Sequence, residues 1–112
     1  MKIYYKNKSI NISVKKLSSF NRLIGLMFKS KTNDNLLFEF NKDVKMSIHS
    51  YFVFFDFLAV WLDKSNNVIE FKIVRPFSFM VKSKKPSSKF IEVPINNKNK
   101  KIIDFFVGKG KI

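Results

Sequence analysis

A single histidine, His49, is the residue best suited to acid–base chemistry in this chain. A catalytic imidazole needs an orienting carboxylate and a nucleophile or substrate proton within hydrogen-bond reach. The chain has no cysteine and no second histidine, so a zinc or iron site would have to combine one imidazole with carboxylates alone. We therefore expect no metal and no cofactor, and a structural or pocket-lining role for His49.

Arginine is rare in this lysine-rich chain, with two arginines, Arg22 and Arg75, against 20 lysines. A planar guanidinium can form a bidentate pair with a carboxylate, which lysine cannot. Asp63, Glu39 and Glu92 are the partners we consider for Arg22. An ion pair that holds the fold is the simpler interpretation and ligand binding is the alternative. The same reasoning applies more weakly to Arg75.

No motif in the sequence marks an enzyme. The acidic residues are scattered, and the chain has only three glycines, too few for a glycine-rich phosphate loop. A carboxylate pair assembled by the fold, as in a glycosidase, stays open. We lean towards a protein that is not an enzyme.

Aromatic side chains supply the other candidates for recognition. Most of the 14 phenylalanines must be buried, whereas Tyr51 and Trp61 each carry a polar group and are the better surface candidates. The candidate ligand-binding residues are therefore Arg22, His49, Tyr51, Trp61, Asp63 and Arg75. We expect one concave site near Arg22, His49 and Tyr51 that takes a small molecule or a peptide.

The composition predicts one domain over residues 1–112 and no membrane partner. A chain of 112 residues with 46% hydrophobic residues can build one core. The longest apolar run, residues 51–62, is interrupted by Asp56 and is shorter than the roughly 20 residues of a membrane helix. The first 16 residues carry five lysines and no signal-peptide pattern. We expect a cytoplasmic protein whose oligomeric state the sequence leaves open.

The net charge of +14 has two interpretations. Residues 1–40 carry a net +6 and residues 81–112 a net +7, whereas residues 41–80 carry +1. A basic surface at both ends suits nucleic acid, and this is our alternative function. The bias towards Lys, Asn, Ile, Phe and Tyr also follows from A/T-rich codons, and so few arginines argue against a phosphate-reading surface. We favour the compositional explanation.

Alternating apolar and polar residues predict short strands at close spacing. Ser18 and Ser19 are candidate caps for a short helix near residues 18–27, and residues 102–107 fit either a short helix or a strand. Seven or more strands with one short helix predict a mainly β sandwich or small barrel. The expected strands are residues 2–5, 10–16, 36–40, 46–55, 57–63, 68–74, 77–81 and 89–93.

Several segments together resemble domain of unknown function family 192 (DUF192). Residues 22–29, Arg-Leu-Ile-Gly-Leu-Met-Phe-Lys, resemble its Arg-x-x-Gly-Leu-Met signature. The Ile-His pair at residues 48–49 has the form typical of archaeal members. Weaker similarities follow in the family's order at residues 36–40, 60–69, 75–77 and 90–94.

This resemblance implies a mostly β fold like a small jelly roll, with a short helix near the Gly-Leu-Met motif. It implies no activity, because the family has no agreed one. The chain departs from the family pattern at Leu58 and Lys109, where an aspartate is usual. Any role of those carboxylates in relatives is therefore in doubt here.

Overall fold

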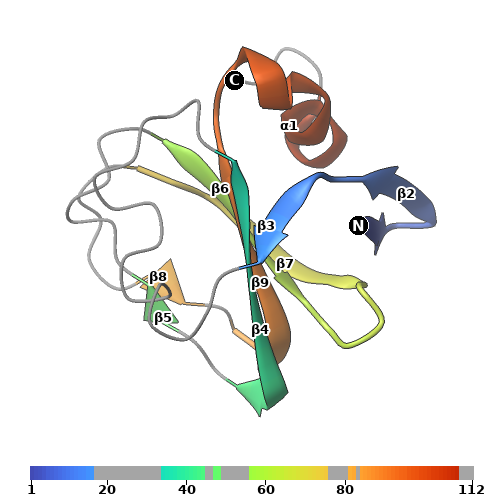
Figure 1. Ribbon diagram of the computed structural model, residues 1–112, viewed down its shortest axis with the longest axis vertical. Helices are drawn as coiled ribbons and strands as arrows, with labels where there is room; N and C mark the ends of the chain where they lie inside the picture. The colour runs from blue at the N-terminus through green and yellow to red at the C-terminus, as the bar shows by residue number, and fades with distance from the viewer. Residues whose placement is uncertain (17–33, 45–46, 49–55, 76–80, 83, 109–112) are drawn as a thin grey trace.

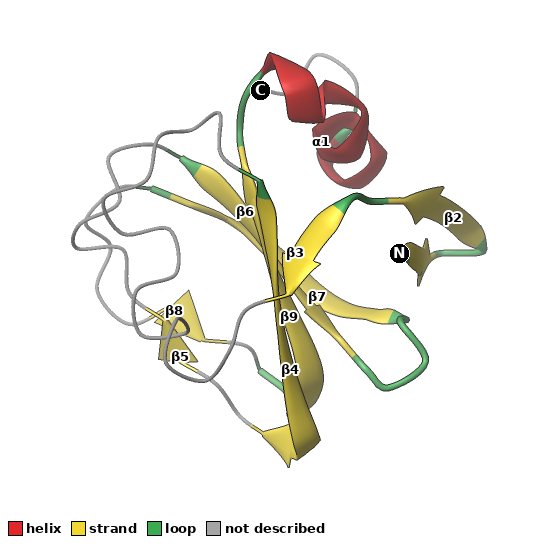
Figure 2. Ribbon diagram, viewed as in Figure 1, coloured by secondary structure: helices red, strands yellow, loops and turns green. Residues whose placement is uncertain are grey.

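The computed structural model describes residues 1–16, 34–44, 47–48, 56–75, 81–82 and 84–108. Their strands form one five-stranded sheet and two two-stranded sheets (Figures 1 and 2). The elements are β1 (Lys2–Tyr5), β2 (Lys8–Asn11), β3 (Val14–Lys16), β4 (Asn35–Val44), β5 (Ser47–Ile48), β6 (Phe57–Leu62), β7 (Val68–Val74), β8 (Val81–Lys82), β9 (Ser87–Pro94), the 3₁₀ turn η2 (Asn97–Asn99) and α1 (Lys100–Val107). The expected mainly β fold is confirmed.

The five-stranded sheet has the order β3-β4-β9-β6-β7 and is antiparallel except for the parallel pair β3–β4. All six residues of β6 are buried, because β6 lies between two neighbouring strands and both faces of the sheet are covered there. This buried strand corresponds to the strand expected at residues 57–63.

Along each strand, alternate side chains point to opposite faces of the sheet, and the two faces form two separate hydrophobic cores. One face carries Leu58, Val60 and Leu62, which pack with α1 and with Ile3 and other apolar residues near the N-terminus. The opposite face has its own cluster, formed by Leu36, Phe38, Phe57, Ala59, Trp61, Val74 and Phe90. Figure 1 shows β1, β2 and α1 on one side of the sheet and β5 and β8 on the other. The arrangement is sandwich-like, and the described strands close no barrel; the jelly-roll detail stays a prediction.

The helix expected near residues 18–27 lies outside the described residues. The described α-helix is α1, in the stretch where the sequence left helix and strand open. Ile102, Ile103 and Phe106 lie on its buried face at helical spacing. Asn96 caps the preceding turn η2 by accepting a hydrogen bond from the Asn99 N–H at 2.9 Å, and α1 follows directly from that turn.

The single strand expected over residues 10–16 is wrong. The chain pairs with β1 as far as Asn11 and then leaves that hairpin to join β4 through β3. Ile12 ends the hairpin, since its N–H donates to the Met1 carbonyl at 2.7 Å and its side chain is buried. The Asn35 side chain then donates to the Ser13 carbonyl at 3.0 Å, which fixes the crossing between the sheets.

No helix in the described part of the chain combines the length and apolarity needed to cross a membrane.

Candidate ligand-binding site

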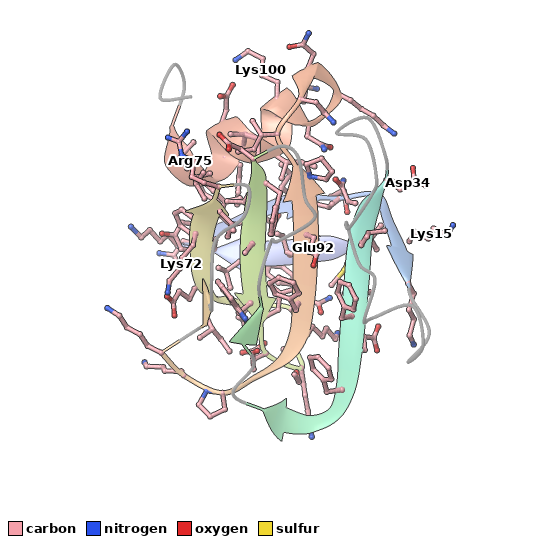
Figure 3. All side chains as sticks on the ribbon, turned by 90° about the vertical axis from the view of Figure 1, so that its left-hand side faces the viewer. Lys15, Asp34, Lys72, Arg75, Glu92 and Lys100 are labelled. Atoms are coloured by element: carbon pink, nitrogen blue, oxygen red, sulfur yellow. The ribbon has the colours of Figure 1, made fainter. Side chains whose placement is uncertain are left out.

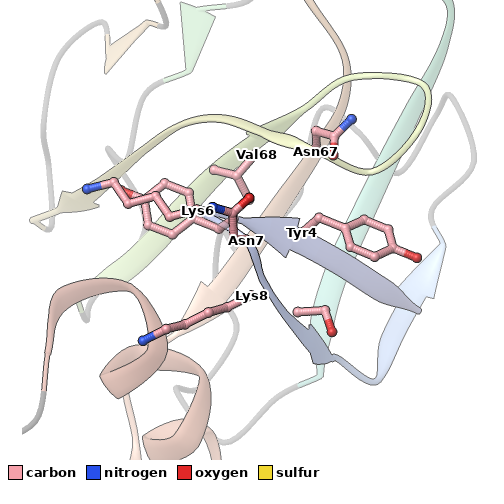
Figure 4. A pocket seen from close by; sticks show the side chains of 8 residues that line it. Tyr4, Lys6, Asn7, Lys8, Asn67 and Val68 are labelled. Carbon is pink, nitrogen blue, oxygen red and sulfur yellow. The ribbon is translucent and has the colours of Figure 1, made fainter.

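An open pocket of about 530 Å³ lies at the tip of the β1–β2 hairpin (Figure 4). Its size falls in the ordinary range of small-molecule sites, about 300–1,000 Å³. We call it the hairpin pocket. It is lined by Tyr4, Tyr5, Lys6, Asn7, Lys8, Ser9, Asn67 and Val68.

The hairpin tip is a two-residue turn. Tyr5 pairs with Lys8, and the two residues between them, Lys6 and Asn7, have φ angles of 48° and 64°. Turns with two positive φ angles match the twist of hairpin strands and prefer Asn and Gly. Asn7 fits this preference, whereas the left-handed region costs a residue such as lysine roughly 1–2 kcal/mol. The backbone geometry of this turn therefore disfavours lysine at position 6.

The second wall of the pocket is the turn between β6 and β7, and backbone contacts join it to the hairpin. The Tyr4 N–H donates to the Asn66 carbonyl at 3.0 Å, and the Asn66 side chain donates to the Lys2 carbonyl at 3.1 Å. Tyr4 also forms a parallel bridge with Asn67. The two walls are thus held together by hydrogen bonds between segments more than 60 residues apart in sequence.

Asp63 holds the turn that carries Asn67. Its carboxylate accepts hydrogen bonds from the N–H groups of Ser65 and Asn67, both at 2.9 Å, and from the Asn67 side chain at 3.1 Å. Burial raises the pKa of Asp63, but the hydrogen bonds from Asn67 and Ser65, with the positive charge of Lys89, outweigh this and leave the pKa below the usual 3.8. Lys89 also donates to the Asn66 side chain and the Lys64 carbonyl, so β9 supports the same turn.

Aromatic contacts fix the hairpin to the rest of the molecule. The Tyr5 ring lies 5.6 Å from Phe71 on β7 and 5.7 Å from Phe106 on α1, between ring centroids. Phe71 and Phe106 also contact each other at 5.1 Å. Offset and edge-on pairs at such distances are favourable. The hairpin that carries the pocket is therefore held in place by this cluster of three aromatic rings.

The charge of the pocket is positive. Of its described lining residues two are lysines and none is acidic. The Lys6 ammonium lies 5.2 Å from the Tyr5 ring centroid, and the Lys2 ammonium lies 5.9 Å from that of Tyr4. Among the described residues no carboxylate forms an ion pair with these lysines or with Lys8. The charges remain available to an anion.

The lining groups are of kinds that commonly bind ligands. Ammonium, amide and hydroxyl groups can hold an anionic or hydroxylated ligand. Within the described ranges no three His, Cys, Asp or Glu side chains come close enough to hold a metal ion.

Of the site residues expected from the sequence, the structure describes Trp61, Asp63 and Arg75, and these three do not meet in one place. Arg22, His49 and Tyr51 lie outside the described residues, and so does any pairing of Arg22. Asp63 follows β6 and Arg75 follows β7, so these two lie at opposite ends of the β6–β7 hairpin. Whether any of these residues binds a ligand stays a prediction.

Trp61 is not at the surface, so that expectation was wrong. Its side chain is 0% exposed and packs against Phe90, with ring centroids 5.2 Å apart. Trp61 alternates along β6 with Phe57 and Ala59 on the same face of the sheet, and all three belong to the cluster that also contains Phe90. The Lys72 ammonium lies 5.8 Å from the Trp61 ring. The indole Nε1 is buried and has no hydrogen-bond partner among the residues that the structure describes.

Arg75 forms an ion pair with a carboxylate, as its chemistry suggested, but the partner is Asp56. Arg75 Nη1 lies 3.3 Å from Asp56 Oδ2, and the arginine side chain is 78% exposed. The Asp56 carbonyl accepts a hydrogen bond from the Ile95 N–H at 3.1 Å. Figure 3 shows Arg75 beside Lys72 at the β7 side of the sheet, away from Lys15 and Asp34. An ion pair this exposed contributes little to stability.

None of the residues that line the hairpin pocket is among the expected site residues. Two signals in the sequence point to them. Residues 6–9, Lys-Asn-Lys-Ser, are a polar stretch between two expected strands, and no acidic residue precedes Asp34. What the sequence could not show is that Asn67 and Val68 lie against this turn, because that contact depends on tertiary structure.

The DUF192 family model, described as "Uncharacterized ACR", matches residues 3–104. A UPF0127 protein from Thermococcus kodakarensis is 31% identical over 93 residues, which cover 80% of this chain and 59% of that protein. The chain thus spans about three-fifths of the length of this curated relative. The assignment to an archaeal type stays a prediction.

Two solved structures share the fold. A chain from Sinorhizobium meliloti, described provisionally as a transcription regulator, has a TM-score of 0.73 at 15% identity and covers 90% of this chain and 81% of its own length. A protein of unknown function from Novosphingobium aromaticivorans has a TM-score of 0.64 at 11% identity, with coverages of 84% and 69%. At such low identity the similarity concerns the fold alone.

Proposed function

This chain belongs to the DUF192 family, and on that premise we propose that it is a non-enzymatic module that binds a small anionic molecule in the hairpin pocket. The observation that carries the proposal is the composition of the pocket wall, where Lys6 and Lys8 are joined by amide and hydroxyl groups and no acidic side chain is present among the described lining residues. Location in the cytoplasm remains a prediction from the sequence.

The pocket's charge supports an anion because nothing in the described structure neutralises it. A buried or paired lysine would have little attraction left for a ligand, whereas unpaired lysines at an open pocket attract anions over about 10 Å at ordinary salt. The volume of about 530 Å³ suits a small molecule.

Calorimetric titration with inorganic pyrophosphate at low salt tests the proposal. We expect saturable binding that is lost when both lysines are neutralised, in the double variant Lys6→Gln and Lys8→Gln. The double variant Lys15→Gln and Lys101→Gln is the matched control, since it also removes two positive charges and both side chains are exposed and lie outside the pocket. Absence of binding, or equal binding by the double variant, would refute the proposal.

Nucleic acid binding through the basic ends of the chain is the second candidate. It draws on the absence of acidic residues before Asp34. At the other end, two lysines are already engaged, Lys98 with Asp34 at 3.7 Å and Lys100 with Asp104 at 2.9 Å. This candidate predicts retention on a DNA or RNA column at physiological salt, with a steep dependence on salt concentration. Complete elution at physiological salt would refute nucleic acid binding by the basic ends.

A further inference from the structure

We infer that the ligand of the hairpin pocket is a nucleotide, with its phosphates on Lys6 and Lys8 and its base stacked on Tyr4. The inference rests on the proposed function, which requires only an anion, and adds the chemistry of the rest of the ligand. A nucleotide can be free or part of a single strand, and the binding of a short oligothymidylate distinguishes these two sources.

Tyr4 provides a surface for a planar group. Within the described ranges it is the one large apolar side chain that is exposed, at 42%. Tyr5, the next residue, also lines the pocket, but its ring packs in the aromatic cluster with Phe71 and Phe106. An exposed ring on a strand is a stacking surface for bases. The Lys2 ammonium near this ring places positive charge beside it.

Lys6 provides charge at a position where the backbone disfavours lysine. Its φ angle of 48° belongs to a turn that Asn or Gly would form more easily. Non-glycine residues in the left-handed region are often found at functional sites. A role in binding explains why an ammonium occupies this position.

The arrangement of these groups calls for an elongated ligand with two different ends. Figure 4 shows the Lys6 and Lys8 side chains extending to one side of Asn7 and the Tyr4 ring to the other. A ligand that touches both must pass Asn7, and the amide groups of Asn7 and Asn67 and the Ser9 hydroxyl also line the pocket. A nucleotide has this order, with an anionic end, a hydroxylated sugar and a planar base.

Comparison of adenosine diphosphate with inorganic pyrophosphate tests the inference, because both carry a diphosphate and only one carries a base. We expect the nucleotide to bind about 5- to 150-fold more tightly, the range of one stacked base. Tyr4→Leu should remove this advantage, so that the variant binds adenosine diphosphate and pyrophosphate with similar affinity. Tyr4→Phe keeps the ring and should retain the advantage. Lys6→Gln should weaken both ligands, whereas Lys15→Gln should weaken neither.

The two hypotheses fail in different ways. If neither ligand binds, the proposed function is wrong. If pyrophosphate binds as tightly as adenosine diphosphate, or Tyr4→Leu keeps the nucleotide's advantage, the nucleotide inference alone is overturned. A short oligothymidylate distinguishes the sources: tighter Tyr4-dependent binding of the strand assigns the pocket to single-stranded nucleic acid, and tighter binding of the free nucleotide assigns it to that molecule.

Discussion

The Asp63 carboxylate accepts two hydrogen bonds from Asn67, one from its N–H at 2.9 Å and one from its side-chain amide at 3.1 Å. Asn67 is also the residue that bridges to Tyr4 and lines the hairpin pocket. One carboxylate therefore shapes a tight turn and, through it, one wall of the candidate site.

Removal of this carboxylate should loosen the turn. Asp63→Ala leaves the N–H groups of Ser65 and Asn67 without their acceptor, and we expect a loss of about 1–2 kcal/mol in the free energy of unfolding. Urea denaturation measures the loss. Asp104→Ala is the control, since Asp104 makes an exposed pair with Lys100 that should contribute under about 0.5 kcal/mol. Equal losses in the two variants would contradict the assigned role of Asp63.

Stability should fall with acid because two carboxylates have lowered pKa values in the folded protein. For Asp63, burial raises the pKa, but the hydrogen bonds from Asn67 and Ser65 outweigh it, so the pKa lies below the usual 3.8. For Glu70, burial raises the pKa, but the hydrogen bond from the Lys84 N–H and the contact with Lys72 outweigh it, so the pKa lies below the usual 4.5. A lowered folded pKa gives stability that is present above the unfolded pKa and is lost as pH falls through the folded value.

We therefore expect the free energy of unfolding to change little with pH near neutrality, where both carboxylates are ionised in the folded and unfolded states, and to decrease on acidification below about pH 5. Denaturation measured between pH 7 and pH 2.5 checks this, and Asp63→Asn should flatten part of the slope. An acid slope identical in Asp63→Asn and wild type would contradict the pKa shift of Asp63.

The hairpin turn should become more stable when Lys6 is replaced by the residue that the turn prefers. Lys6→Asn removes the cost of lysine at positive φ, and we expect a gain of up to about 1 kcal/mol. Lys8→Asn should bring no gain, because Lys8 is a strand residue with ordinary backbone geometry. Thermal unfolding of both variants measures the difference, and destabilisation by Lys6→Asn would refute it.

Much of the β6–β7 hairpin follows from local sequence pattern, a continuous apolar run in β6 and period-two alternation in β7. Phe57–Leu62 and Val68–Val74 are strands as expected, and the turn between them contains two asparagines, a residue that tolerates the left-handed backbone of tight turns. Asn66 adopts the left-handed conformation there, with φ of 68°. Local pattern suffices in this hairpin because both strands and the turn are contiguous.

Other features depend on contacts between distant residues. The strand expected over residues 10–16 divides because Ile12 pairs with Met1 and Val14 pairs with Asn35. Trp61 was expected at the surface because of its polar nitrogen, yet its strand is buried on both faces. The hairpin pocket needs Asn67 beside Tyr4, a relationship between residues 63 positions apart that no local pattern contains.

The burial of Trp61 can be checked by fluorescence, since it is the only tryptophan. With its side chain 0% exposed, the native protein should emit at short wavelength and resist quenching by iodide. Unfolding in urea should shift the emission to longer wavelength and restore quenching. Native quenching as strong as that of free tryptophan would show that the second core is not closed over this ring.

The central claim is that the hairpin pocket binds an anionic ligand, and an NMR titration of ¹⁵N-labelled protein with adenosine diphosphate tests it most directly. We predict saturable shifts concentrated in the amides of residues 4–9 and 67–68, and their loss in the double variant Lys6→Gln and Lys8→Gln. Saturable shifts centred on other residues, such as Arg22 and His49, or the absence of saturable shifts, would contradict it.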